Sequence, residues 1–220
     1  MLFYRIIKRW FDICASGFAL IVLLPIWLIA TIGIEISDPG PVFYIAKRVG
    51  KDNKVFRMFK FRSMRVDKKA NEKSLRPDQN RIFPWGRVMR STKIDELPQL
   101  LNVFLGSMSV IGPRPAAVDQ VEITRSGENS VLSQLVPGLS GPSSLYDYIY
   151  GDQFEEEAEY NEKVLPTRLK LDVYYIEAQS AGYDIKMIWW TILCILVRGQ
   201  RERILEELLK GVQSVGQNKE

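Results

Sequence analysis

The sequence contains no histidine among its 220 residues. This absence excludes Ser-His-Asp and Cys-His catalytic triads, histidine general bases and histidine metal ligands. Any catalysis must therefore depend on carboxylates, lysine, arginine, tyrosine or a hard metal ion held by oxygen ligands. Chemistry at phosphate groups is compatible with that set of side chains.

Cysteine is also scarce, and the common glycine-rich phosphate loops are missing. The only cysteines, Cys14 and Cys194, lie far apart in apolar surroundings, which offers neither a disulfide framework nor a zinc-site spacing and indicates a reducing compartment. The chain has no Gly-x-x-x-x-Gly-Lys-Ser/Thr and no Gly-x-Gly-x-x-Gly motif. We therefore expect any nucleotide to be held in another way.

The composition fits one domain with a basic balance. Apolar residues make up 46% of the chain, which is enough to bury a core. Lysine and arginine total 30 against 26 acidic residues, and the sequence pI is about 9.0. This charge suits an anionic partner such as a phosphate, a nucleotide or an acidic lipid, without choosing among them.

Residues 15–34 carry no charge and are numerous enough for a membrane-crossing helix. Pro25 lies near the middle of this stretch, where it removes a helix hydrogen bond and clashes with the preceding turn. Basic residues flank the stretch on both sides, at Arg5, Lys8 and Arg9 before it and at Lys47, Arg48, Lys51 and Lys54 after it. Because positive charge stays cytoplasmic, we expect a re-entrant segment broken at Pro25, with both chain termini on the cytoplasmic side.

An ordinary single-pass anchor with a proline kink is the alternative for this segment. At its entrance, Asp12 is expected to pair with Lys8 or Arg9, one helical turn back.

The rest of the sequence predicts a fold that contains both strands and helices. Residues 42–44 and 55–61 read as two strands of a small hairpin around the turn at 50–53, and residues 65–82 as a polar loop with some helix. Helices are expected at 95–105, ended by Gly106, and over much of 153–181, with rigid loops at 112–115 and 137–142. The apolar run 185–197 is either an interfacial membrane helix or a buried core helix.

The candidate chemical centre is the adjacent pair Asp95 and Glu96. On a helix the two side chains diverge by roughly 100°, so one carboxylate can face a phosphorus atom while the other holds a metal ion. The candidate cations for phosphate groups are Lys60, Arg62, Arg87, Arg90 and Arg114. Mg²⁺ is the metal that suits a diphosphate.

Each feature also has a plainer explanation. An acidic pair in a first helical turn often only complements the helix dipole. The alternation at 59–62 is typical of any half-buried strand, and the loop at 112–115 of a stiff turn.

These features occur in the order found in one family. The matching stretches are 8–12 (KRWFD), 59–64 (FKFRSM), 90–103 (RSTKIDELPQLLNV), 108–115 (MSVIGPRP), 137–141 (PGLSG), 172–175 (DVYY) and 184–186 (DIK). With them the chain resembles the monotopic phosphoglycosyl transferases, the bacterial sugar transferase family, from about residue 5 to 197. The block at 90–115 is the most specific part of the resemblance.

The resemblance implies a two-step, ping-pong transfer at the cytoplasmic face of the bacterial inner membrane. Asp95 would attack the sugar-proximal phosphorus of a UDP-sugar and release UMP, and a polyprenol phosphate, undecaprenyl phosphate in this family, would then take the sugar phosphate. Glu96 would hold Mg²⁺ beside Asp95, while Lys60, Arg62, Arg90 and Arg114 would bind phosphates or support the site. Arg9, Asp12 and Pro25 would be structural residues of the membrane segment.

Such a reaction is the first membrane step of assembling a capsule, O-antigen, exopolysaccharide or glycoprotein glycan. Membrane lipids, a second copy of the chain and downstream glycosyltransferases are the other partners this implies, and no nucleic acid. Two stretches depart from the family pattern. Leu24 replaces the serine that usually precedes Pro25, and residues 143–148 lack the familiar Asn-Gly-Arg, which points to a different sugar or a different hold on the nucleotide.

We therefore expect an α+β fold, mainly helical, with a small β-hairpin, one Pro-broken re-entrant membrane helix and interfacial amphipathic helices. The expected units are a membrane segment at 1–36, a catalytic domain at 37–200 and a C-terminal tail at 201–220. A non-catalytic, membrane-bound scaffold that binds anionic lipid is the rival function. Nucleic-acid binding draws only on the basic balance, and the membrane segment argues against it.

Overall fold

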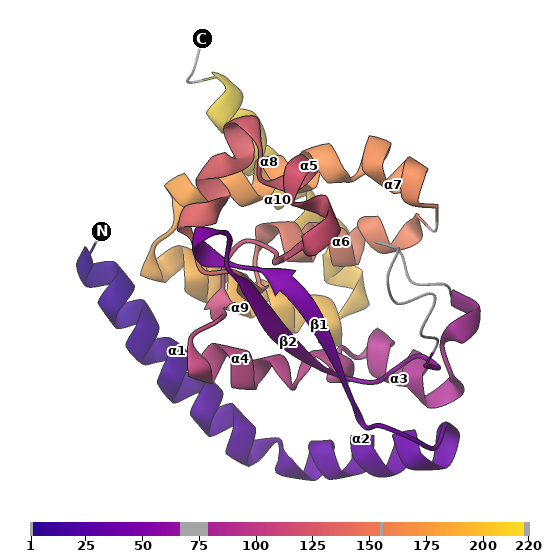
Figure 1. The fold of residues 1–220 in the computed structure, drawn as a ribbon. Coiled ribbons are helices and arrows are strands. Elements are labelled where there is room, and N and C mark those ends of the chain that lie inside the picture. Colours follow the sequence, from indigo (N-terminus) through magenta and orange to yellow (C-terminus); the bar gives the residue numbers. More distant parts are fainter. Residues whose placement is uncertain (1, 67–78, 155, 218–220) are drawn as a thin grey trace.

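The computed structural model describes residues 2–66, 79–154 and 156–217 and begins with two helices that meet at a sharp bend (Figure 1). Helix α1 (Leu2–Val22) and helix α2 (Leu24–Ser37) are bent by 59° at their junction. Pro25 lies in the first turn of α2, where its missing N–H costs no bond within the helix. The predicted break at Pro25 is confirmed.

No single helix in the described ranges is long and apolar enough to cross a membrane. Together, α1 and α2 reach that length and composition, but only as a bent pair. Such a pair is compatible with a broken crossing as well as with a re-entrant segment, so re-entry stays a prediction at this stage.

The predicted hairpin is present and longer than expected. Strand β1 (Phe43–Val49) pairs antiparallel with β2 (Val55–Phe61), and Tyr44 faces Lys60 across the pair. The sequence did not indicate the second half of β1, because the charged residues Lys47 and Arg48 stand between the buried Ala46 and Val49. A short strand, β4 (Ala116–Ala117), extends this sheet along β1.

A second, parallel pair of short strands replaces part of what the sequence suggested were rigid loops. Strand β3 (Ser109–Ile111) pairs with β5 (Gly138–Ser140). The strands leave no room for a side chain at Gly138, where an added Cβ would lie 2.2 Å from the backbone nitrogen of Gly112. The loop that follows β3, which carries Arg114, is fixed here by a hydrogen bond of 2.8 Å from the Gly138 N–H to the Pro113 carbonyl.

Helices form the rest of the chain, as the predicted α+β class requires. They are α3 (Pro84–Ser91), α4 (Gln99–Leu105), α5 (Val121–Thr124), α6 (Pro142–Ile149), α7 (Glu157–Lys163), α8 (Leu165–Ala178), α9 (Ala181–Leu196) and α10 (Arg201–Gln217). Short 3-10 turns are η1 (Lys51–Asn53), η3 (Gln79–Arg81), η4 (Ile94–Glu96), η5 (Val118–Gln120), η6 (Gly127–Gln134), η7 (Gly151–Gln153) and η8 (Arg198–Gln200).

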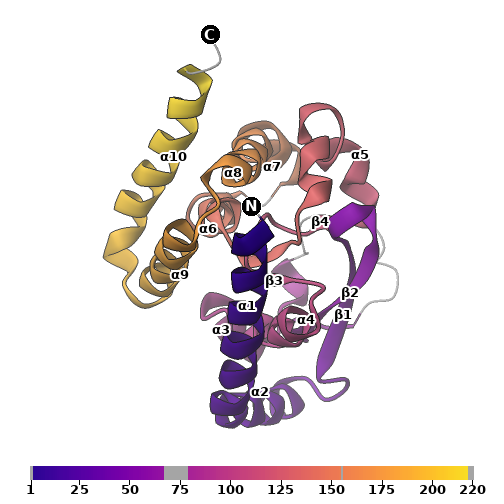
Figure 2. The same ribbon diagram turned by 90° about the vertical axis from the view of Figure 1, so that its left-hand side faces the viewer.

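The largest apolar core lies among α6, α8, α9 and α10, around Tyr146, Tyr175, Met187 and Leu208. A smaller cluster joins α2 to β2 and α3. The helical prediction for 153–181 is confirmed by α7 and α8, whereas much of the predicted loop at 65–82 lies outside the described residues. Most of the segment set apart as a C-terminal tail forms α10 (Arg201–Gln217), which buries Ile204 and packs on α6 and α8 (Figure 2).

Helix α9 shows two different faces. Met187 and Cys194 are buried in the core, whereas Ile185, Trp189 and Leu196 point away from it and are 64%, 59% and 75% exposed. The spacing of these exposed residues makes one apolar stripe along the helix. One face of α9 is therefore a core face, as one of the two alternatives predicts, and membrane contact of the exposed face stays a prediction.

Helix α1 is joined to α4 and β3 by Arg9 and Asp12. Arg9 donates hydrogen bonds of 2.7 Å to the carbonyl oxygens of Val103 and Phe104, the last turn of α4. Asp12 is buried and accepts the backbone N–H of Val110 in β3 at 2.9 Å.

The expected pairing of Asp12 with Lys8 or Arg9 is therefore wrong. Lys8 instead forms an ion pair with Asp184 of α9 at 2.5 Å. The reason is tertiary: α1 packs against α4, β3 and α9, and the groups on those elements supply buried partners that an exposed pair within one helix cannot match.

We expect Arg9→Ala to destabilise the fold, because the terminal carbonyls of α4 lose their donors. The loss should be about 1 kcal/mol, seen as a lower melting temperature of the purified protein in detergent. The exposed Arg5 of the same helix is the matched control, as Arg5→Ala. Equal melting temperatures for the two variants would show that Arg9 does not fasten α1 to α4.

Candidate active site

Asp95 and Glu96 lie in the 3-10 turn η4, which we call the acidic turn, between α3 and α4. The chain enters it through Lys93, whose backbone is left-handed with φ 58°. Regular α-helix begins only at Gln99, later than the predicted start at Asp95. Pro98 has no N–H to donate, so the bonds before it close over three residues, as from the N–H of Leu97 to the carbonyl of Ile94.

Helix α4 ends where the sequence predicted, at Gly106, which is left-handed with φ 90°. Because Asp95 precedes the short helix α4 by a turn, the helix dipole acts on it more weakly than the sequence analysis assumed. Other charges must therefore account for its ionisation.

The Asp95 carboxyl is almost completely buried, with 5% of the residue exposed. Its Oδ1 atom has no hydrogen-bond partner within residues 2–66, 79–154 and 156–217. Burial raises the pKa of Asp95, and the neighbouring Glu96 adds to this, whereas the cations Lys60, Arg90 and Lys93 act against it. Asp95 thus presents a poorly solvated oxygen atom, which makes its ionised form a good nucleophile.

Glu96 is held in the opposite electrostatic state by Lys60. The Lys60 Nζ atom on β2 lies 3.0 Å from Glu96 Oε1, and both side chains are only about a fifth exposed. Burial alone would raise the pKa of Glu96, but Lys60, Lys93 and Arg114 together outweigh it and lower the pKa. The acidic turn therefore combines one firmly ionised carboxylate with one that is harder to ionise.

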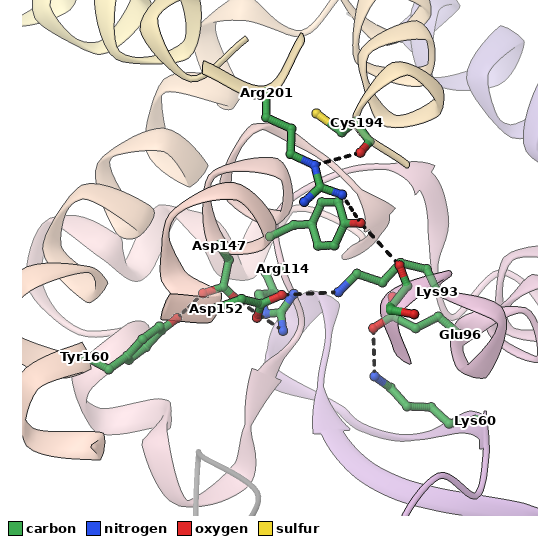
Figure 3. Close-up of polar contacts among 11 residues, drawn as sticks. Lys60, Lys93, Glu96, Arg114, Asp147, Asp152, Tyr160, Cys194 and Arg201 are labelled. Carbon is green, nitrogen blue, oxygen red and sulfur yellow. Dashed lines mark hydrogen bonds and ion pairs between the residues drawn. The ribbon is translucent and has the colours of Figure 1, made fainter. Parts of the chain in front are cut away.

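Arg114 is held by Asp147 of α6 and Asp172 of α8, and Figure 3 shows its side chain beside Asp147. Its Nη2 atom lies 3.2 Å from Oδ2 of Asp147 in α6. The Tyr160 hydroxyl of α7 donates to the same Asp147 carboxylate at 2.8 Å. The backbone N–H of Arg114 donates to Asp172 of α8 at 3.1 Å, which fixes the loop that carries it.

Asp147 holds the pKa of Arg114 above its usual value, although burial acts in the other direction. The guanidinium is therefore permanently charged, and 38% of its side chain remains exposed and accessible to an anion.

The other three predicted cations differ in their surroundings. Arg87 is exposed on α3. Arg90 is half-buried in the last turn of α3, and within the described ranges its side chain has no hydrogen bond or ion pair. It acts on the charge of Asp95 through space. Arg62 is not brought into the cluster: it is buried, donates to the carbonyl of Pro41 at 2.6 Å and pairs with Asp38.

In this structure Arg62 is engaged outside the acidic turn, and its assignment as a phosphate ligand stays a prediction. Its donors hold the turn between α2 and β1, and these contacts would have to break before it could bind a phosphate. The alternation of the sequence placed Arg62 on the same strand face as Lys60. Strand β2 ends at Phe61, however, so Arg62 lies just beyond the sheet.

Sequence reasoning did not single out Asp147, Tyr160 or Lys93. Asp147 lies in the stretch 143–148 that departs from the family pattern, and Asp172 lies in a stretch that matches it. These were the available signals, but neither says which cation each acid faces. Only the packing of α6, α7 and α8 shows that they surround Arg114.

The acidic turn fits a magnesium ion that also binds a ligand phosphate. No group of three His, Cys, Asp or Glu side chains that could hold a metal occurs in the described part of the chain. Mg²⁺ is nevertheless commonly bound by one or two carboxylates, with water and substrate phosphates completing its shell. The unpartnered Oδ1 of Asp95 and the ionised Glu96 would provide those two carboxylates.

Comparison with known proteins bears on this arrangement. A family model described as "Bacterial sugar transferase" matches residues 3–198. A Rhizobium leguminosarum bv. phaseoli relative, "Exopolysaccharide production protein PSS", is 35% identical over 208 residues, which cover 89% of this chain and 98% of the relative.

Two longer relatives carry more specific names. The Aeromonas hydrophila "UDP-N-acetylgalactosamine-undecaprenyl-phosphate N-acetylgalactosaminephosphotransferase" is 36% identical over 88% of this chain. The Escherichia coli "UDP-glucose:undecaprenyl-phosphate glucose-1-phosphate transferase" is 34% identical over 86% of it. The chain spans less than half of each, 44% and 40% of their length.

Asp172 should make the stability of the fold depend on pH. Burial raises its pKa to about 6, against the attraction of Ser143, Arg168 and Arg114. Since the folded state binds this proton more tightly than the unfolded chain, the stabilisation is complete below pH ~4 and is lost as pH rises through about 6. In Asp172→Asn, which keeps an acceptor for the Arg114 N–H but cannot ionise, we expect this loss, roughly 2–3 kcal/mol, to disappear.

The measurement is urea or thermal unfolding of both proteins between pH 4 and pH 7.5. The exposed Glu177 on the same helix provides the control, as Glu177→Gln. Parallel stability curves for wild type and Asp172→Asn would contradict the prediction.

Proposed function

The chain belongs to the bacterial sugar transferase family, and from that premise we propose that it transfers a sugar 1-phosphate from a UDP-sugar to a polyprenol phosphate. Undecaprenyl phosphate is the acceptor that the names of relatives suggest. The names differ in the sugar, which is N-acetylgalactosamine in one relative and glucose in another, so they support the class of donor rather than one sugar.

The observation that carries this proposal is the buried Asp95 carboxylate with an unpartnered oxygen, surrounded by cations. A structural aspartate in such a place would be expected to use both oxygens in hydrogen bonds. A nucleophile instead needs one oxygen that no other group occupies. The nearby positive charges, chiefly Lys60, keep part of the Asp95 population ionised despite its burial.

The proposed reaction has two displacements at phosphorus. In the first, an Asp95 oxygen attacks the sugar-proximal phosphorus of the UDP-sugar, a new P–O bond forms and the bond to the UMP oxygen breaks. In the second, an oxygen of the polyprenol phosphate attacks the same phosphorus and the bond to Asp95 breaks. The products are UMP and a polyprenol diphosphate sugar, and the carboxylate is regenerated.

The cations around the acidic turn have distinct tasks in this scheme. Arg114, with its exposed guanidinium, is placed to bind phosphate oxygens that would otherwise repel Asp95. Lys60 keeps Glu96 ionised, and Arg90 favours the ionised form of Asp95. Asp95 and Glu96 would hold Mg²⁺, which neutralises charge on a diphosphate when bound.

We also propose that the chain lies on the cytoplasmic face of the bacterial inner membrane. Exposed apolar side chains of α1 and α2, among them Phe18, Ile21 and Leu28, cover the outside of the bent pair. The exposed stripe of α9 adds Trp189 and Leu196. Exposed apolar surfaces such as these favour a lipid environment over water. The basic residues on both sides of the bent pair favour re-entry from one side.

Asp95→Asn should abolish UMP release and the covalent adduct, because an amide oxygen is a poor nucleophile towards phosphorus. The assay uses purified protein in nanodiscs with a panel of UDP-sugars, Mg²⁺ and undecaprenyl phosphate. Intact-mass analysis without acceptor should show one sugar phosphate added to wild type and none to the variant. Asp119→Asn, an exposed aspartate on η5, is the matched control and should behave as wild type.

Turnover by Asp95→Asn at the wild-type rate would overturn the role of Asp95. A wild-type protein that binds anionic lipid but releases no UMP from any donor would favour the rival function, a non-catalytic scaffold.

The re-entrant topology predicts that both ends of the chain are reached from one side. In a background with Cys14→Ser and Cys194→Ala, single cysteines are placed at the exposed Arg5 and Lys210 positions. An impermeant maleimide should label both in inverted inner-membrane vesicles and neither in intact spheroplasts. Labelling of position 5 and position 210 from opposite sides would instead demonstrate a crossing.

A further inference from the structure

Lys93 connects α3 to the acidic turn in a conformation that needs support. Its left-handed backbone, with φ 58°, is unfavourable for a residue that has a Cβ and persists only where neighbouring contacts fix it. The Lys93 Nζ atom lies 4.3 Å from the centroid of the Tyr148 ring and 3.8 Å from Oδ2 of Asp152. Both partners come from the segment that α6 and η7 form.

Tyr148 contacts both ends of the connection that Lys93 makes. Its ring lies under the Lys93 ammonium, and its hydroxyl is 3.5 Å from the carbonyl oxygen of Ser91, the last residue of α3. Tyr148 is half-buried and belongs to the stretch 143–148 that departs from the family pattern.

Arg201 fixes Tyr148 from the C-terminal helix. Its Nη2 atom donates to the Tyr148 hydroxyl at 2.7 Å, and its Cζ atom lies 4.6 Å from the ring centroid. Its Nε atom donates to the carbonyl of Cys194, in the last turn of α9, at 3.0 Å. Figure 3 follows these contacts from Cys194 and Arg201 towards Lys93.

An arginine in the first turn of α10 is unfavourable for that helix, because the helix N-terminus is the positive end of its dipole. Contacts outside α10 must account for its placement. Arg201 also lies beyond residue 198, where the match to the family model ends.

We propose that α10 completes the active site: Arg201 fixes Tyr148, and Tyr148 holds the Lys93 ammonium beside the acidic turn, where it helps to bind the donor diphosphate. Tyr148 and Arg201 are positioning residues that act through Lys93. This inference rests on the proposed function, since the diphosphate is the ligand that Lys93 would meet.

The arrangement reduces the cost of binding. A lysine side chain loses much conformational freedom when it contacts a ligand, and a side chain that is already held by an aromatic ring loses less. Its pairing with Asp152 is loose, at 3.8 Å, and 56% of the Asp152 side chain is exposed. The ammonium can therefore exchange this carboxylate for a phosphate without leaving the Tyr148 ring.

The test compares Arg201→Gln with Arg203→Gln. Arg203 is an exposed arginine two residues further along the same helix. Both full-length variants are assayed in nanodiscs for UMP release over a range of UDP-sugar concentrations. We expect Arg201→Gln to raise the donor KM about three- to tenfold, the range a cation–aromatic contact supports. The kcat should remain close to that of Arg203→Gln, and the melting temperature should fall only slightly, because the Cys194 carbonyl loses its Arg201 donor.

Substitutions at Tyr148 separate the ring from the hydroxyl. Tyr148→Leu should raise the donor KM at least as much as Arg201→Gln. Tyr148→Phe keeps the ring under Lys93 but loses the hydroxyl that accepts from Arg201, so its KM should lie between those of wild type and Tyr148→Leu. If Arg201 acts through Tyr148, the double variant Tyr148→Leu/Arg201→Gln should have the KM of Tyr148→Leu alone.

A purely structural role predicts a different result. Arg201→Gln would then lower the melting temperature and the active fraction and leave the donor KM equal to that of Arg203→Gln, which would overturn the inference while the proposed function stands. A wild-type protein that releases no UMP with any UDP-sugar would refute the proposed function, and the inference would fall with it.

Discussion

A carboxylate buried without a full set of hydrogen bonds destabilises a fold, and the arrangement around Asp95 follows from this constraint. The opposing charges come from separate elements: Lys60 from β2, Arg90 from α3 and Lys93 from the connection before the acidic turn. The hairpin and α3 must therefore be assembled together before the carboxylate can ionise. Strain of this kind is concentrated at functional sites, where the surrounding structure holds a group in a state that water would not favour.

The same site is fastened to the segment proposed to enter the membrane. Arg9 of α1 binds the last turn of α4, whose first turn follows the acidic turn directly, and Asp12 binds β3, which leads to Arg114. Lys8 ties α1 to Asp184 of α9. These polar contacts fix the height of the Asp95 carboxylate, which means its position relative to α1 and α2 along the direction into the proposed membrane. A lipid phosphate has a restricted depth in the bilayer, so the proposed second displacement needs such a fixed height.

Local signals in the sequence were sufficient for several of the elements. Pro25 marked the helix break, the turn at 50–53 marked the hairpin, and Gly106 marked the end of α4, because each acts through its own backbone. Contacts between distant elements could not be read in this way. The partner of Asp12 and the confinement of Arg62 depend on packing, and the exposed stripe of α9 became separable from its buried face only in the assembled fold.

The acids of α6 and η7 have a consequence for donor choice. In the structure Asp147 faces Arg114 and Asp152 faces Lys93, so each carboxylate reduces the repulsion among cations that would otherwise crowd the acidic turn. In the proposed reaction the donor diphosphate competes with these same carboxylates for the same cations. Changes in residues 142–153 would then alter the hold on the donor without altering Asp95 or Glu96.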